Sequence, residues 1–177
     1  MKQLFLLAIS LNIALSITAD AHSMYQSAVV LDLHANAVDA ELQLPVDRLS
    51  ISFRQPVDAQ YFPAERNALM SYVLAHVHPV TEDNREFAVD IRSMEIKTIE
   101  NAPYLVTRLV FAPPKGASTN RFTLNYDVIT HEIVTHVVLV SIRSDDSVRI
   151  QPADPLLLGI IRGPRKSISV DRTKLPL

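Results

Sequence analysis

Strict alternation of apolar and polar residues is the feature that most limits how this chain can fold. From residue 38 to 44 every second side chain is apolar and the residues between are Asp, Glu or Gln, and the same alternation returns over 122–128. Successive side chains of a strand point to opposite faces, so each segment predicts a strand with one buried face. A chain built mainly from such strands favours two packed sheets.

Other segments extend this pattern. Further strands are expected over 24–33, 87–99, 104–112, 134–142 and 148–150. The alternation in 87–99 changes phase near Arg92 and Ser93, which indicates a bulge or a break between two strands. The run 134–142 is apolar at both phases, which is typical of a central strand covered on both sides. Prolines and glycines after residue 150 predict an irregular C-terminal segment over 151–177.

One segment has helical periodicity instead. Its apolar stripe consists of Leu69, Met70, Val73, Leu74 and Val77. Pro63 suits the first turn of this helix, and Pro79 prevents its extension past His78. The predicted fold class is therefore mostly β, an antiparallel, immunoglobulin-like β-sandwich with one inserted α-helix, formed as a single domain over 22–150.

The N-terminus has the three parts of a secretory signal peptide. Lys2 provides the positive end, residues 4–17 are an apolar stretch, and Ala19-Asp20-Ala21 is a small-residue cleavage site. Cleavage would leave a mature chain that begins at His22 and contains no membrane span, and an uncleaved N-terminal anchor is the alternative. We therefore expect an exported protein of the periplasm or cell envelope.

Composition excludes several classes of function. The formal net charge is only −2, which gives no field to hold nucleic acid. Cysteine and tryptophan are both absent, which excludes disulfides and thiol nucleophiles and disfavours a stacking platform for bases. About 155 mature residues suit one domain with a substantial core.

Several short motifs together resemble a known family. They are Ala21-His22-Ser23, the segment 44–49 (LPVDRL), the helical segment 69–78 and the late strand 122–128 (FTLNYDV). Their order over most of residues 21–150 is similar to the N-terminal extracytoplasmic domain of HupE/UreJ-like membrane proteins. In that family a bundle of transmembrane helices associated with nickel or cobalt transport follows this domain.

The resemblance implies a non-catalytic accessory or binding module, linked to metal uptake through a polytopic membrane protein. The sequence contains no counterpart of the transmembrane bundle, so no metal-ligating residue can be carried over from it. The exported domain itself has no assigned chemistry that could be transferred. Candidate ligands must therefore come from the residues of this chain.

Histidines are the natural candidates, and His131 and His136 form the most suggestive pair. The segment 131–136 (HEIVTH) separates its histidines by five residues, whereas a zinc protease needs a separation of four to place both on one helical face. The spacing therefore argues against catalytic zinc. We interpret His131 and His136 as parts of a corner between strands, and we interpret His76 and His78 as favourable residues at a helix C-terminus.

His22 offers a different metal chemistry. After cleavage its α-amine and imidazole could chelate copper as a histidine brace, as in small exported copper-resistance proteins. Such a brace needs one more histidine from elsewhere in the fold. The possible partners are His34, His76, His78, His131 and His136. A copper-binding protein is therefore the alternative function.

An exported hydrolase is the third interpretation. The sequence contains no Gly-x-Ser-x-Gly motif, no phosphate-binding glycine loop and no calcium loop, and it has only three glycines. No nucleophile–base pair can be identified from spacing. We therefore expect a protein that binds rather than catalyses, with His22, His131 and His136 as candidate metal ligands and no established cofactor.

Overall fold

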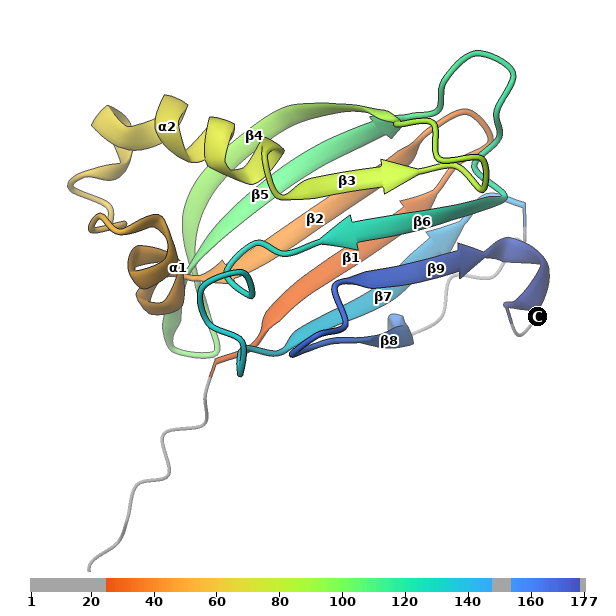
Figure 1. Cartoon of the computed structure of the whole chain (residues 1–177). Coiled ribbons are helices and arrows are strands. Elements are labelled where there is room, and N and C mark those ends of the chain that lie inside the picture. Colours follow the sequence, from red (N-terminus) through yellow and green to blue (C-terminus); the bar gives the residue numbers. More distant parts are fainter. Residues whose placement is uncertain (1–24, 148–153, 176–177) are drawn as a thin grey trace, which may run out of the picture.

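Two β-sheets packed face to face form the body of the molecule (Figure 1). The computed structural model describes residues 25–147 and 154–175, which form nine strands and two α-helices. The larger sheet has the strand order β4-β5-β2-β1-β7-β8 and the smaller one β3-β6-β9. Both helices lie at the same end of the sandwich. The prediction of a mostly β sandwich with an inserted helix is confirmed.

The larger sheet consists of β1 (Ser27–Leu33), β2 (Val38–Pro45), β4 (Ala88–Ile99), β5 (Ala102–Ala112), β7 (Val138–Asp145) and β8 (Leu156–Ile161). The smaller sheet consists of β3 (Val77–Val80), β6 (Arg121–Tyr126) and β9 (Ser167–Asp171). The helices are α1 (Val46–Phe53) and α2 (Phe62–Leu74), and a short 3-10 helix, η1 (Arg172–Lys174), follows β9.

The core lies between the two sheets and beneath the helices. The alternating strands β2 and β6 bury every second side chain, as their sequences predict. The fully buried members include Leu31, Leu42, Leu44, Leu105, Leu109 and Phe111 from the larger sheet, Leu124 and Tyr126 from the smaller sheet, and Leu49 and Leu69 from the helices. These residues all belong to one contiguous hydrophobic cluster.

One local prediction is confirmed in detail. The pairing of β4 with β5 shifts register between Ile91 and Ser93, where the alternation changes phase. Glu100 and Asn101 both have positive φ, 48° and 67°, in the turn between these strands. Such a two-residue turn matches the twist of an antiparallel hairpin.

The sheet arrangement differs from the expectation in one pairing. β1 lies parallel to β7, while the other pairings are antiparallel. Six and three strands also differ from the four and three of an immunoglobulin constant domain. Alternation reveals which face of a strand is buried but not which distant strand pairs with it, so the sequence pattern could not show this.

The helical region differs at both of its ends. Residues 46–53, for which the sequence pattern predicted no helix, form α1. Arg54 ends that helix in the left-handed conformation, with a φ of 61°. The predicted helix ends at Leu74 and not at His78, because the chain turns at Ala75 into β3. Pro79 therefore lies in an edge strand, where its missing N–H is tolerated.

The prediction of an irregular segment over 151–177 is wrong. β8 joins the larger sheet and β9 the smaller one, so the sandwich continues to Asp171. β8 does not alternate because its register shifts beside Val140. The strand predicted from residue 134 begins only at Val138, and the one predicted over 148–150 lies outside the described residues.

Neither α1 nor α2 could span a bilayer, and no other α-helix occurs in the described part of the chain.

Candidate functional site

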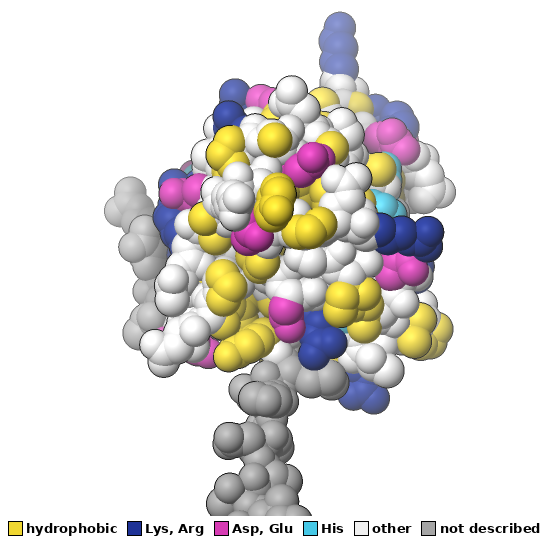
Figure 2. Space-filling view, turned by 90° about the vertical axis from the view of Figure 1, so that its left-hand side faces the viewer, with side chains coloured by type: hydrophobic (Ala, Val, Ile, Leu, Met, Phe, Trp, Pro, Cys, Tyr) yellow, Lys and Arg dark blue, Asp and Glu magenta, His cyan; other side chains and the backbone are white. Residues whose placement is uncertain are grey.

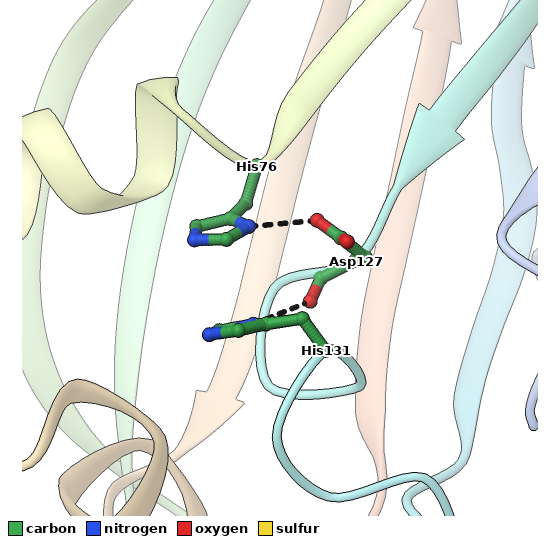
Figure 3. Close-up of side chains that lie close together, drawn as sticks. All are labelled: His76, Asp127 and His131. Atoms are coloured by element: carbon green, nitrogen blue, oxygen red, sulfur yellow. Dashed lines mark hydrogen bonds and ion pairs between the residues drawn. The ribbon is translucent and has the colours of Figure 1, made fainter.

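Three polar side chains from separate segments meet where the helices join the smaller sheet (Figure 3). His76 lies between α2 and β3, Asp127 follows β6, and His131 belongs to the turn after it. One potential metal-ligating atom from each residue lies within 4.8 Å of the others. All three residues are partly exposed, so the cluster is accessible from solvent.

The backbone brings these residues together. The chain leaves α2 after Leu74, and the carbonyl of His76 then accepts a hydrogen bond of 3.1 Å from the backbone N–H of Asp127. The next residues fold into a tight turn in which the N–H of His131 donates to the carbonyl of Asp127, at 3.0 Å. Asp127 is thus bonded through its backbone to both histidine-bearing segments.

Both imidazole rings also donate to Asp127, and this fixes their tautomers. Nδ1 of His76 lies 2.7 Å from the carboxylate Oδ1 of Asp127, and Nδ1 of His131 lies 3.0 Å from its backbone carbonyl. A carbonyl and an ionised carboxylate can only accept, so Nδ1 carries the proton in each ring. In the neutral imidazoles, Nε2 therefore carries the free lone pair.

The two rings stack on one another. Their centroids are 4.1 Å apart and their planes differ by 17°. Both Nε2 atoms point away from Asp127, to the same side (Figure 3). Two neutral imidazoles with adjacent free nitrogens form a pair of nitrogen ligands, and they can converge on one ion when the rings tilt out of the stack.

Asp127 is itself held ionised. Burial raises the pKa of its carboxyl, but hydrogen bonds from His76 and Lys166 outweigh burial and bring the pKa below its usual value. Nζ of Lys166 lies 3.0 Å from Oδ2, so both carboxylate oxygens are engaged. This makes Asp127 a group that orients imidazoles and not a free metal ligand.

Unfavourable features concentrate in the chain around Asp127. Ile129 has a φ of 69° although it is β-branched, and its side chain is fully buried. The hydroxyls of Tyr126 and Thr130 are buried and have no hydrogen-bond partner in the described structure. Strained backbone and unpaired buried groups accumulate where function requires a particular geometry. The turn carrying His131 is therefore a candidate functional segment.

The other predicted candidates do not join this cluster. His136 is buried, with 5 % of its surface exposed, and its Nε2 lies 2.8 Å from the hydroxyl of Ser27. Burial lowers the pKa of His136 to about 4. Ser27 is fully buried, so this serine–histidine pair offers no accessible nucleophile and only a weak base. His22 lies outside the described residues.

Two histidines are engaged elsewhere. Nδ1 of His34 lies 2.7 Å from the carboxylate of Asp146. The ring of His78 bonds the carbonyl of Ala75, with Nε2 at 2.9 Å from its oxygen. Of the candidate histidines that the structure describes, only His131 and His76 come together.

Sequence reasoning missed the roles of His76 and Asp127. His76 was assigned to a helix, and Asp127 was one more polar residue of an alternating strand. The sequence spacing gave no signal, because the two are 51 positions apart and meet only through the loop that ends α2.

Comparison with known proteins adds no relative. No protein-family model matches the sequence, and no curated protein matches it. The chemistry of the cluster is therefore the basis for a functional proposal. It combines two neutral imidazole nitrogens with an orienting carboxylate, which is the arrangement found around transition-metal sites.

Proposed function

We propose that this protein is an exported, non-catalytic envelope domain that binds a divalent transition-metal ion through Nε2 of His76 and His131. Its role would be that of an accessory module in nickel or cobalt uptake by a membrane protein of the HupE/UreJ-like type. The observation that carries the proposal is the pair of Nδ1–H groups donating to Asp127, which leaves both Nε2 atoms free on one side.

The donor set favours a particular class of ion. Imidazole suits Ni, Cu, Zn and Fe, whereas Mg and Ca prefer oxygen ligands. Two nitrogens from the chain leave further positions for water or for a donor from a partner. Such an open site suits an ion that is bound and then passed to a partner. The predicted export and the family resemblance connect this binding to metal uptake.

Metal titration of the mature chain starting at His22 tests the proposal. Calorimetry with Cu(II), Ni(II), Co(II) and Zn(II) is expected to give one ion per chain at micromolar affinity or tighter. His131→Ala and His76→Ala should each weaken binding at least 10-fold. The matched control is His78→Ala, which removes a nearby exposed imidazole outside the pair and should leave binding unchanged. Absence of binding with all four ions, or binding that survives both substitutions, would overturn the proposal.

Copper binding through the mature N-terminus is the second candidate. Tyr25, the first described residue, lines the same pocket as Ile133, so the chain enters the fold beside the turn that carries His131. One residue added before His22 blocks the α-amine and separates the two functions. Loss of Cu(II) binding in that variant, with the His76→Ala variant unaffected, would favour the histidine brace.

A further inference from the structure

Tyr72, in α2, packs its ring against both imidazoles of the proposed metal site. Its ring lies 4.8 Å from the ring of His76 and 5.7 Å from that of His131, measured between centroids. Its hydroxyl accepts the backbone N–H of Ile129 at 3.2 Å and lies 2.8 Å from the hydroxyl of Ser52 in α1. Tyr72 thus connects both helices to the turn after β6.

The hydrogen bond to Ile129 reaches the strained point of that turn. A β-branched residue is strongly disfavoured at a φ of 69°, so surrounding contacts must hold it there. The carbonyl of Ile129 is occupied within the turn by the N–H groups of Glu132 and Ile133. Its N–H points instead to Tyr72, which supplies the side-chain contact from outside the turn.

We infer that Tyr72 is a positioning residue of the metal site: its hydroxyl holds the Ile129 turn in the conformation that places Nε2 of His131 beside Nε2 of His76. Its ring packs against both imidazoles and limits how far they tilt. Because this role concerns the ion proposed above, it depends on metal binding by the His76–His131 pair.

Tyr72→Phe tests the role, since it keeps the ring and removes the hydroxyl. Titration of the mature chain with Cu(II) chloride and Ni(II) chloride should show an affinity about 10-fold weaker than that of the unmodified protein, the low end for loss of an outer-shell contact. The visible absorption band of bound Cu(II) should shift, because the imidazoles approach the ion differently. The amide resonance of Ile129 should also move in the metal-free variant.

Ser52→Ala is the matched control. It removes the other hydrogen bond of the same hydroxyl and leaves the bond to Ile129 in place. We expect a similar loss of thermal stability but an affinity within twofold of the unmodified protein and an unchanged Cu(II) band. Equal weakening of binding in both variants would show that Tyr72 acts through general stability and would overturn the inference.

The two proposals fail in different ways. If the unmodified chain binds metal and Tyr72→Phe binds it with the same affinity and spectrum, the positioning role is wrong and the metal site stands. If the unmodified chain binds none of the ions, the metal site is wrong and the positioning role is wrong with it.

Discussion

The two ends of the sandwich differ in whether their buried polar groups have hydrogen-bond partners. At the end away from the helices, Arg172 is 8 % exposed and its guanidinium meets the carboxylate of Asp145. The same guanidinium donates to the hydroxyl of Thr119 at 3.0 Å and to the carbonyl of His34 at 3.1 Å. At the helical end, Thr130 and its neighbours contain unpaired hydroxyls and a strained backbone.

The buried polar groups around Arg172 stabilise the fold, whereas those at the helical end lie beside the candidate site. The satisfied cluster around Arg172 joins the C-terminal segment to β7, to the loop after β1 and to Thr119. At the helical end, strained backbone and unpaired hydroxyls lie near the His76–His131 pair. Local inconsistency of this kind is expected at functional sites and not at purely structural ones. Figure 2 shows the helical end, where apolar and charged side chains are interspersed.

The largest effect on stability is expected from breaking the Arg172–Asp145 pair, at the end away from the helices. Asp145→Ala leaves the Arg172 guanidinium buried without its counter-charge, which should lower the free energy of unfolding by about 3–5 kcal/mol. Urea denaturation measures the change. Asp146→Ala, which alters the neighbouring exposed carboxylate, should cost less than about 1 kcal/mol. Equal losses in the two variants would show that burial of the Arg172–Asp145 pair does not set the size of the effect.

Acid should weaken the helical end through His136. The pKa of His136 is about 4 in the folded chain, below the ordinary value of 6.5, so the unfolded chain binds more protons between these values. Its contribution to stability is present above pH 6.5 and is lost as the pH falls through 4, by about 3 kcal/mol in total. The difference in unfolding free energy between the unmodified protein and His136→Gln, followed over this range, isolates the effect. A difference independent of pH would contradict it.

Asp127→Asn should affect binding more than folding. The amide keeps the shape of the side chain but loses the charge that orients the imidazoles, so Ni(II) affinity should fall about 10- to 100-fold. Calorimetry measures the affinity. Asp171→Asn changes a carboxylate bonded to Thr173 and should leave the affinity unchanged. Wild-type affinity in Asp127→Asn would show that the carboxylate does not orient the site.

A pair of isosteric substitutions gives the smallest effects but the clearest difference in sign. Thr130→Val removes a buried hydroxyl that has no hydrogen-bond partner among the described residues and should stabilise the fold by about 1 kcal/mol. Thr119→Val removes a buried hydroxyl bonded to Arg172 and to the carbonyl of His34, and it should destabilise the fold by about 1–2 kcal/mol. Thermal denaturation of both variants measures the two signs. Effects of the same sign would contradict the comparison.

Local periodicity was enough to predict much of the sandwich. It identified the strands over 38–44 and 122–128, the bulge near Arg92 and the helical stripe at Leu69, because each depends on neighbours in the sequence. β9 was also within reach, since Ser167–Asp171 alternates buried and exposed side chains as cleanly as β2. The prolines and glycines after residue 150 nevertheless favoured the prediction of an irregular segment.

The site was beyond such reasoning. His131 was named from its sequence, but its partner His76 depends on where α2 ends, and Ala75 carries no distinctive stop signal. The role of Asp127 depends on a tertiary contact of its carboxylate with His76. Parallel pairing of β1 with β7 is likewise a long-range choice that no local pattern encodes.

That parallel pairing also determines when the protein can fold. β1 emerges first from any process that delivers the chain from its N-terminus, yet its partner β7 follows roughly a hundred residues later. Contacts between segments so far apart in the chain slow folding, since a large loop must close before they form. The hairpin of β1 and β2 must therefore wait, with an open apolar edge, until nearly the whole chain has arrived.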